Sequence, residues 1–448
     1  MTAAPPGLII AAPASGSGKT TLTLALLRHL RNLGMRVASV KVGPDYIDPA
    51  FHQAAGGRPC RNIDGWAMRP AAQAAVLAAA GADADLVLCE GVMGLFDGAA
   101  VQGHEGLAAG STAELAARTG WPVALVIDCR GMGASVAALA RGFAAFHPSV
   151  LVSGVILNNA ATPRHEGLLR DACGKAGLRV FGALRRDGAL ERPSRHLGLV
   201  QAAEDEGLDA FLEVAAAAAG AQLDIAALLA AARPARLAAP TAGSLPVPPL
   251  GQRIAVAADV AFSFAYPLVL EGWRRAGAEV VPFSPLADEA PDAAADAVYL
   301  PGGYPELHAG RLAGSARFLE GLRSAPARGA AVYGECGGYM VLGQGLEDAE
   351  GRRHGMAGLL PLESSFRAPE RHLGYRRATL MAACPLGAPG AAYRAHEFHY
   401  ARVIGREGPA ASALFRVTDA AGEDRGPAGQ RCGHVSGSFL HVIDREEI

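Results

Sequence analysis

Residues 7–34 read GLIIAAPASGSGKTTLTLALLRHLRNLG. The first six residues of this stretch are apolar and predict a buried strand, and the leucine-rich residues after the loop predict a helix. The loop between them is rich in glycine and ends in Gly18, Lys19 and Thr20. A strand, a glycine-rich loop and a helix in this order are the context that a phosphate-binding loop requires.

The residue types of this loop suit a bound nucleoside triphosphate. Backbone N–H groups at a helix N-terminus bind phosphate oxygens, a lysine reaches the outer phosphates, and a threonine hydroxyl ligates Mg²⁺. The loop departs from the usual spacing, because Pro13 stands where a glycine is expected and Ala12 stands where a longer variant loop has its first glycine. The alternative is a glycine-rich turn that binds nothing. The residues expected to bind ATP are Ser15, Gly16, Ser17, Gly18, Lys19, Thr20 and Thr21.

Acidic side chains follow two further apolar segments. The stretch KVGPDYIDP (41–49) carries Lys41, Asp45 and Asp48, and LVLCEGVMGLFDG (86–98) carries Glu90 and Asp97. In an open α/β sheet, ligands collect at the carboxyl ends of the strands, so these acids are expected beside the phosphate loop. Any one of them alone could be a solvated loop acid, but together they predict a site for a magnesium nucleotide.

Two β/α alternations follow one another along the chain. Apolar runs alternate with helical stretches in residues 1–228, which predicts a parallel sheet covered on both faces. The Ala-rich stretch 213–232 predicts a helix pair, and the Ala- and Pro-rich residues 229–250 predict a linker, with a surface loop as the alternative. A second alternation begins at residue 251 and becomes richer in β-strands toward residue 448. The expected fold is α/β in both domains.

Bulk properties exclude several classes of protein. The chain has 448 residues, enough for two domains, and a formal net charge of −2, so no nucleic-acid surface is expected. We expect no membrane span and no signal peptide, because the N-terminal apolar run is short and lacks a basic leader. Its seven cysteines are widely spaced without a CxxC pair, so we expect a reduced, cytoplasmic protein without disulfides or structural zinc.

One cysteine stands in a distinctive setting. The stretch VYGECGGYM (332–340) places Cys336 between an apolar run and a predicted helix, among glycines. A sharp strand-to-helix turn exposes a nucleophile, and the helix N-terminus is expected to lower the pKa of the thiol. The N–H groups of Gly337 and of Gly302 or Gly303, in LPGGYPE (300–306), are the expected oxyanion donors. The alternative is a cysteine that only fills the core.

A thiolate nucleophile needs a base. The candidates are His396 and His399 in RAHEFHY (394–400), and His434 and His441 in HVSGSFLHVID (434–444). Residue types alone do not choose among these four histidines.

The ordered set of motifs resembles the cobyrinic acid a,c-diamide synthase family of corrinoid biosynthesis, which includes the hydrogenobyrinic acid a,c-diamide synthases. The resemblance covers nearly the whole chain. It implies an N-terminal P-loop domain similar to dethiobiotin synthetase and a C-terminal class I glutamine amidotransferase domain, with residues 229–250 between them. The motifs that carry it are SGSGKTT, KVGPDYIDP, EGVMGLFDG, RHLGLV, LPGGYPEL, YGECGGYM, HEFHY and GSFLH.

The resemblance also implies roles in the C-terminal domain. Cys336 would attack the amide of glutamine, His441 would be the base, and Gly303 and Gly337 would form the oxyanion hole. Many class I glutaminases carry an acid two residues after this histidine, whereas this chain has Ile443. Glu397 is the expected substitute that orients His441.

In the N-terminal domain, the resemblance implies that ATP phosphorylates the a and c acetate carboxylates of the corrinoid and that ammonia then displaces the phosphate. Lys19 and Thr20 would hold phosphate and metal, with Asp45 and Glu90 as further Mg²⁺ ligands. Ammonia is expected to travel along an internal path between the domains. The remaining implied roles are for Asp48 and Asp97 in positioning, Lys41 in neutralising the transferring phosphate, and Arg195 and His196 in shaping the nucleotide or corrinoid pocket.

Rival functions remain at this point. Cobyric acid synthase shares both domains, an amidotransferase for a lipid-linked cell-wall precursor would need a ligase partner, and a P-loop ATPase with an inert C-terminal domain would not need Cys336. Within the family, Ala12 and Ser17 resemble the branch that acts on metal-free hydrogenobyrinic acid, while cobalt-containing cobyrinic acid is the alternative acceptor. The oligomeric state is not specified by the sequence, and a homodimer is one option.

Overall fold

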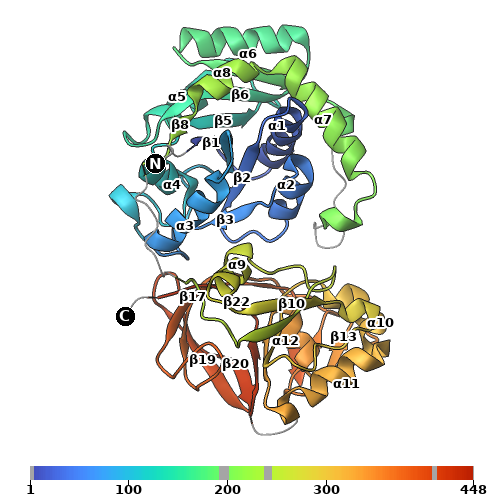
Figure 1. Ribbon diagram of the computed structural model, residues 1–448. Coiled ribbons are helices and arrows are strands. Elements are labelled where there is room, and N and C mark those ends of the chain that lie inside the picture. Colours follow the sequence, from blue (N-terminus) through green and yellow to red (C-terminus); the bar gives the residue numbers. More distant parts are fainter. Residues whose placement is uncertain (1–4, 191–200, 237–244, 406–410, 447–448) are drawn as a thin grey trace. The chain divides into compact units, whose positions relative to one another are not determined.

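The computed structural model describes residues 5–190, 201–236, 245–405 and 411–446. The chain folds into two compact units (Figure 1). The N-terminal unit comprises Met1–Trp66 and Gln73–Ala242, and the C-terminal unit comprises Ala67–Ala72 and Gly243–Ile448. None of the helices in the described ranges has both the length and the apolar character that a membrane span needs.

The N-terminal unit is built on one largely parallel sheet. Its strand order is β3-β2-β4-β1-β5-β6-β7, and the short β8 pairs antiparallel with β1. Because β1 lies between β4 and β5, the loop after it opens at the point where the strand order reverses direction. The strands are β1 (Pro6–Ala11), β2 (Val37–Val42), β3 (Arg61–Ile63), β4 (Leu86–Glu90), β5 (Val123–Asp128), β6 (Val152–Ala160), β7 (Val180–Arg185) and β8 (Arg233–Pro234).

Helices cover this sheet and bury its apolar strands, as the sequence predicted. One face packs against α1, α2, α7 and α8, whose leucines and alanines share a core with Leu8 and Ile10 of β1. Arg28 of α1 is buried and pairs with Asp209 and Glu213 of α7, which joins these neighbouring helices (Figure 1). The helices are α1 (Lys19–Asn32), α2 (Asp48–Gly56), α3 (Pro70–Gly81), α4 (Thr112–Thr119), α5 (Ser135–Ala145), α6 (Pro163–Lys175), α7 (Leu208–Gln222) and α8 (Ile225–Ala231).

The predicted helix pair in the Ala-rich stretch is present as α7 and α8. The predicted linker, residues 229–250, includes the end of α8 and all of β8, so its first residues belong to the N-terminal unit. Leu228 and Ala231 are buried in the core of that unit, which explains why the helix continues past the expected boundary. Residues 237–244 lie outside the described ranges.

The C-terminal unit contains a mixed sheet whose two halves differ in strand direction. The order is β10-β9-β11-β12-β21-β20-β19-β16-β17-β22; the strands from β10 to β21 are parallel, and those from β21 to β22 are antiparallel. The prediction that the C-terminal part is richer in β-strands is therefore confirmed. Its strands are β9 (Arg253–Ala257), β10 (Glu279–Phe283), β11 (Ala297–Leu300), β12 (Ala331–Glu335), β16 (His372–Leu380), β17 (Ala392–His399), β19 (Ser412–Asp419), β20 (Asp424–Cys432), β21 (Val435–Ser438) and β22 (Leu440–Arg445).

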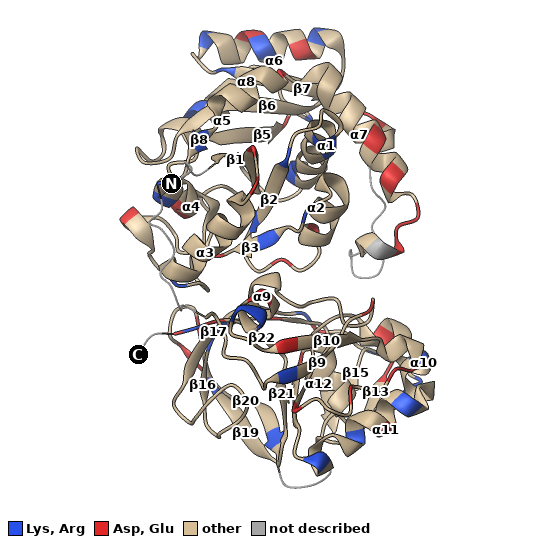
Figure 2. Cartoon of the chain, viewed as in Figure 1, with Lys and Arg blue, Asp and Glu red and all other residues tan. Residues whose placement is uncertain are grey.

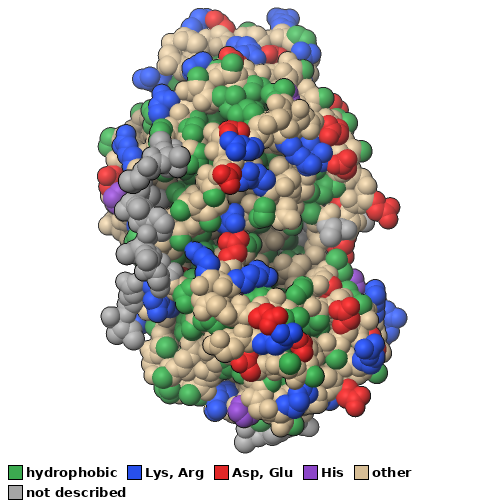
Figure 3. Space-filling model, viewed as in Figure 1, with side chains coloured by type: hydrophobic (Ala, Val, Ile, Leu, Met, Phe, Trp, Pro, Cys, Tyr) green, Lys and Arg blue, Asp and Glu red, His purple; other side chains and the backbone are tan. Residues whose placement is uncertain are grey.

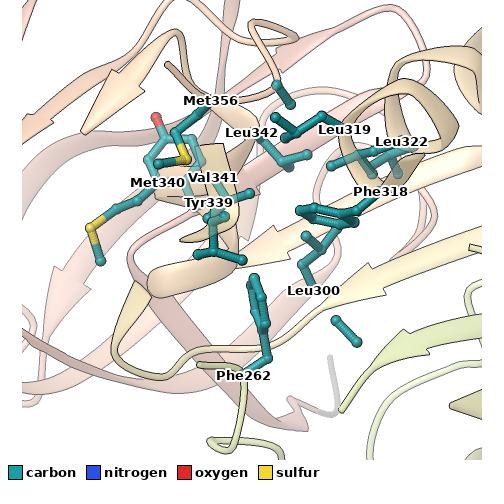
Figure 4. Close-up of a cluster of buried hydrophobic side chains, with 14 of the residues drawn as sticks. Phe262, Leu300, Phe318, Leu319, Leu322, Tyr339, Met340, Val341, Leu342 and Met356 are labelled. Atoms are coloured by element: carbon teal, nitrogen blue, oxygen red, sulfur yellow. The ribbon is translucent and has the colours of Figure 1, made fainter. Parts of the chain in front are cut away.

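Among the described residues, a second, small sheet and four α-helices complete this unit. The small sheet has the order β14-β13-β15-β18. The helix α12 starts after β12 and Cys336, and its residues Tyr339, Met340, Val341 and Leu342 belong to a cluster of buried hydrophobic side chains that also contains Phe318 (Figure 4). This packing holds the β12–α12 turn in place. The elements are β13 (Gly345–Glu347), β14 (Arg353–Gly355), β15 (Glu363–Ser365), β18 (Arg402–Gly405), α9 (Pro267–Arg275), α10 (Ala309–Gly314), α11 (Ala316–Ser324) and α12 (Gly337–Leu342).

Charges of both signs are distributed over the surfaces of the two units. Helix α6 carries basic and acidic side chains along its length (Figure 2). On the face drawn in Figure 3, basic and acidic side chains are interspersed with apolar and neutral ones. This balance agrees with the small net charge of the sequence.

Candidate active sites

The glycine-rich loop of the N-terminal unit lies between β1 and α1, as predicted. Gly18 caps α1 with φ +92°, a left-handed conformation that glycine adopts without strain. A Cβ at this position would lie 2.2 Å from Nδ2 of Asn158, which itself donates to the Ser17 carbonyl over 2.9 Å. Both the backbone conformation and the close approach of Asn158 therefore require glycine here.

Lys19 and Thr20 begin α1 and turn toward the acid-bearing strand ends. The Nζ of Lys19 donates to the Met93 carbonyl over 2.5 Å, and the Thr20 hydroxyl donates to Oε1 of Glu90 over 2.6 Å. Burial lowers the pKa of Lys19, and the neighbouring charge of Lys41 lowers it further. The lysine is thus largely desolvated beside the loop, where an anionic ligand would stabilise its charge.

A buried network of charges surrounds Glu90, which is 0% exposed. Lys41 and Glu90 are neighbours in register on β2 and β4, and Nζ of Lys41 lies 2.7 Å from Oε1 of Glu90 and 2.6 Å from Oδ2 of Asp48. His52 approaches the other oxygen, Oε2, over 2.6 Å. The predicted convergence of these acids on the phosphate loop is present in the structure.

The pKa values in this network follow from burial and close charges. Burial alone would lower the pKa of Lys41 and raise that of Glu90, but their mutual attraction reverses both directions. Burial raises the pKa of Asp48 to about 6, and the charges of Asp45 and Glu90 add to this effect. His52 has a pKa raised to about 10, because Cys60 and Glu90 outweigh its burial. Positive charge added near Asp48 would therefore lower the pKa of this carboxyl group back toward its ordinary value.

The loop and the acids line one cavity of about 880 Å³. Ser15, Gly16, Lys19, Thr20 and Thr21 line it together with Lys41, Asp45, Asp48 and Glu90. Oδ1 of Asp45 accepts the N–H groups of Ile47 and Asp48 at the start of α2, and Oδ2 of Asp97 accepts the N–H of Gly94 within its own loop. Arg195 and His196 lie outside the described residues.

Sequence reasoning missed several residues of this cavity. Asn158 and Asn159 end the apolar run of β6 and line the cavity, and polar residues at a strand end were a signal that could have found them. His52 does not line the cavity but contacts Glu90, which does; it follows Asp48 by four residues on α2, which places both on one helix face. The charged cavity residues that were missed are Arg130, Arg185, Arg186 and Asp187.

In the C-terminal unit, Cys336 occupies the turn between β12 and α12, as predicted. Its φ of 46° and ψ of −105° are unusual for a residue with a side chain, and this strain is typical of a nucleophile at a sharp turn. The thiol lies 3.5 Å from the carbonyl oxygen of Phe398 on β17. Contrary to the expectation of an exposed cysteine, Cys336 is only 3% exposed, because residues of β17 and aromatic side chains of neighbouring loops surround it.

The predicted oxyanion glycines lie close to this cysteine. A Cβ on Gly337 would be 3.1 Å from the backbone nitrogen of Gly303, so the two N–H groups are neighbours. A Cβ on Gly302 would be 3.2 Å from Cβ of Cys336 and 2.3 Å from Cε1 of His441. Gly302 therefore lies against both Cys336 and His441, and its lack of a side chain leaves room for these two residues.

The pKa values of Cys336 and His441 correct one prediction from the sequence. Burial raises the pKa of the Cys336 thiol, Glu306 raises it further, and the N–H of Gly337 opposes them only in part. The prediction that the helix N-terminus lowers the pKa of the thiol is therefore wrong, because α12 has only 6 residues and the thiol is desolvated. Burial lowers the pKa of His441 well below its ordinary value, so its imidazole is neutral and can accept a proton.

The other three histidines lie in different surroundings. His396 is opposite His441 in the β17–β22 pair, and burial lowers its pKa to about 3. His434 is exposed at the turn between β20 and β21. His399 lines the cavity beside Cys336 and lies 3.2 Å from Oε1 of Glu397. Glu397, the expected partner of His441, bonds to His399 and, over 2.8 Å, to Arg376.

The residue before the cysteine, Glu335, has a buried carboxyl group. Oε1 of Glu335, the last residue of β12, accepts the Val442 N–H over 3.1 Å, and Oε2 accepts the Tyr299 hydroxyl over 2.8 Å. Val442 follows His441 on β22, so Glu335 links the strand that ends at the cysteine to the strand that carries the histidine. Burial raises the pKa of Glu335 to about 7 despite these donors.

The cavity at Cys336 is small, about 20 Å³. This space holds about one water molecule, so a larger ligand requires the lining side chains to move. The lining residues are Phe264, Gly303, Tyr304, Glu306, Cys336, Met340, Phe366, Phe398, His399 and Tyr400.

Both units match described protein families. Residues 8–200 match the CobQ/CobB/MinD/ParA nucleotide binding domain, and residues 253–447 match the CobB/CobQ-like glutamine amidotransferase domain. Together these matches confirm the predicted fold class of both halves of the chain.

Similar proteins cover the whole chain. A hydrogenobyrinate a,c-diamide synthase of Sinorhizobium sp is 55% identical over 98% of this chain and 98% of its own length. One of Rhodobacter capsulatus is 56% identical over 99% of this chain and 100% of its own length, and one of Brucella suis is 55% identical over 98% of both. The chain belongs to the hydrogenobyrinate a,c-diamide synthase family.

Proposed function

We propose that this protein catalyses the ATP- and glutamine-dependent amidation of the a and c acetate carboxylates of hydrogenobyrinic acid. One observation supports this most directly: a single chain carries a phosphate loop with converging acids and, separately, a strained cysteine beside a neutral histidine. A ligase that draws ammonia from glutamine needs both sites. The two relatives that match this chain over 98% and 100% of their own length are named for that reaction.

Glutamine hydrolysis is assigned to the C-terminal unit. His441 takes the proton of the Cys336 thiol, and the thiolate attacks the amide carbon of glutamine. The oxyanion that forms is stabilised by the N–H groups of Gly303 and Gly337. The histidine returns its proton to the departing nitrogen, ammonia leaves, and water hydrolyses the remaining thioester. Because both groups start neutral and buried, the proton transfer creates an ion pair that the site must stabilise.

Activation of the carboxylate is assigned to the N-terminal unit. A corrinoid carboxylate oxygen attacks the γ-phosphorus of ATP, and ADP leaves, so that an acyl phosphate is formed. Ammonia then attacks the acyl carbon, and inorganic phosphate departs to leave the amide. Lys19 binds the outer phosphates, and Lys41 neutralises charge near the transferring group. The loop residues Ser15, Gly16, Ser17, Gly18 and Thr21 complete the phosphate site.

The oxygen donors at this site fit Mg²⁺. Thr20 contacts both Asp48 and Glu90, and Asp45 lines the same cavity. Burial raises the pKa of Asp48, and the charges of Asp45 and Glu90 raise it further, an effect that a dication would oppose. Thr20, Glu90 and Asp45 are proposed to hold the ion, which supplies positive charge to the phosphates. Asp48 and Asp97 are assigned positioning roles. A role of Arg195 and His196 in shaping the nucleotide or corrinoid pocket is proposed from the sequence alone.

Replacement of the nucleophile tests whether the two sites are separable. The change Cys336→Ser removes thioester formation, so glutamine-dependent amidation should be lost while amidation with added ammonium salts persists. Cys432→Ser, a half-buried cysteine of the same unit, serves as the matched control and should retain both activities. Failure of ammonia to support the Cys336→Ser variant would contradict separable sites.

A further inference from the structure

Three metal-ligating side chains share one face of the β16–β17 ribbon. His372 lies opposite His399 in the antiparallel register, and Glu397 is two residues before His399, so all three side chains project on the same side. One ligand atom from each lies within 4.8 Å of those of the other two. The two imidazole rings are stacked, with their centroids 4.5 Å apart and their planes at 10°. We call these three residues the imidazole–carboxylate cluster.

The central ring of this cluster has an acceptor on each side. Nδ1 of His399 lies 3.1 Å from the Ala401 carbonyl oxygen, and Nε2 lies 3.2 Å from Oε1 of Glu397. A neutral imidazole carries one proton, so either tautomer leaves one nitrogen lone pair facing an acceptor oxygen. A cation next to Nε2 removes this conflict, because Nδ1–H can then donate to Ala401. Metal-binding histidines typically donate their other N–H to a carbonyl or carboxylate in this way.

We propose that the imidazole–carboxylate cluster binds a divalent transition-metal ion of the zinc class. Two imidazole nitrogens and one carboxylate oxygen are a ligand set of open zinc sites, which keep one position for water. Ligand atoms about 2.1 Å from the ion are roughly 3.4 Å apart in tetrahedral geometry. The distances between the ligand atoms, which are at most 4.8 Å, therefore need to shorten by at most about 1.4 Å, and the two stacked rings need to tilt so that both lone pairs point at the ion. Arg376 bonds to Oε2 of Glu397 and leaves Oε1 for the ion.

The position of the cluster links it to glutamine use, and this step rests on the proposed function. His399 lines the 20 Å³ cavity that also contains Cys336, and glutamine can enter only if the lining side chains move. An ion that binds His372, Glu397 and His399 fixes the His399 ring and resists that movement. The bound ion therefore inhibits the glutaminase reaction and leaves the use of free ammonia unchanged.

Cobalt titration of the full-length protein tests the binding site directly. Metal-free protein is titrated with Co²⁺ in excess Mg²⁺, which occupies oxygen-ligand sites but competes poorly for imidazole. The wild type should bind one equivalent of Co²⁺ with visible absorption bands, and His372→Ala should reduce the affinity at least tenfold. His434→Ala removes an exposed histidine of the same unit and should bind as the wild type does. Absence of the equivalent in the wild type, or equal binding by His372→Ala, would overturn the proposal.

Inhibition by Zn²⁺ tests the consequence separately. Glutamine-dependent amidation by the wild type should fall at least tenfold at saturating Zn²⁺, and His372→Ala should resist this inhibition. Ammonia-dependent amidation should change less than twofold in both proteins. Zinc binding without inhibition would overturn the regulatory effect alone. Lack of amidation from either nitrogen source would contradict the proposed function. The cobalt titration would still show whether the imidazole–carboxylate cluster binds a metal ion.

Discussion

The buried carboxyl of Glu335 makes the stability of the C-terminal unit depend on pH in a specific way. Its pKa is about 7 in the folded chain, compared with an ordinary value of 4.5. A group with a raised folded pKa contributes stability that is complete below the ordinary value and is lost as the pH rises through the folded value. Each unit of difference corresponds to about 1.4 kcal/mol. Between about pH 5 and pH 8, the wild type should therefore lose about 2.5 kcal/mol through this group.

The change Glu335→Gln removes that titration and keeps an acceptor for the Val442 N–H and a polar partner for the Tyr299 hydroxyl. The free energy of unfolding of the variant relative to the wild type should thus rise by about 2.5 kcal/mol from about pH 5 to about pH 8. Urea titrations followed by hydrogen exchange of peptides from β12 and β22 report on the C-terminal unit separately from the N-terminal one.

The matched control is Glu320→Gln, an exposed acid on α11, whose relative stability should stay constant over the same range. A change below about 0.5 kcal/mol for Glu335→Gln, or an equal change for the control, would refute the assignment of a raised pKa to this carboxyl.

Four further substitutions test the two sites. Gly18→Ala forces a side chain into φ +92° and against Asn158, so ATP affinity measured by calorimetry should fall at least tenfold while glutamine hydrolysis persists. Lys41→Met removes the cation that Glu90 and Asp48 share, which should destabilise the N-terminal unit by about 3 kcal/mol in urea and abolish amidation with ammonia. His441→Asn removes the base, so glutaminase turnover should fall by about 10² or more while ammonia-dependent turnover stays within twofold. Glu397→Gln should lower glutaminase kcat if Glu397 positions the base, and full activity would remove it from that role.

Most of the architecture could be predicted because it depends on local patterns. Continuous apolar runs such as residues 7–12 predict strands buried on both faces, and Gly18-Lys19-Thr20 after such a run predicts a helix N-terminus that binds phosphate. In each of these cases, the residues that interact are close in the sequence.

The features that could not be predicted depend on long-range contacts. The burial of Cys336 comes from β17, about 60 residues further along the chain, and this burial overrides the effect of a short helix on the thiol. The raised pKa of Glu335 likewise depends on the strands that enclose it. The contact of His399 with Glu397 follows from their spacing of two residues on one strand. The stacking of His372 on His399 could be predicted only if the register of β16 against β17 were known.

The most direct test of the central claim is an amidation assay followed by mass spectrometry. The protein, ATP, Mg²⁺ and glutamine are incubated separately with hydrogenobyrinic acid and with cobyrinic acid, and each conversion of a carboxylic acid to an amide lowers the mass by about one unit. We expect two such steps and then no more, with hydrogenobyrinic acid as the faster substrate. A faster reaction with cobyrinic acid would reassign the acceptor, and no amide product from either acid would contradict the proposed function.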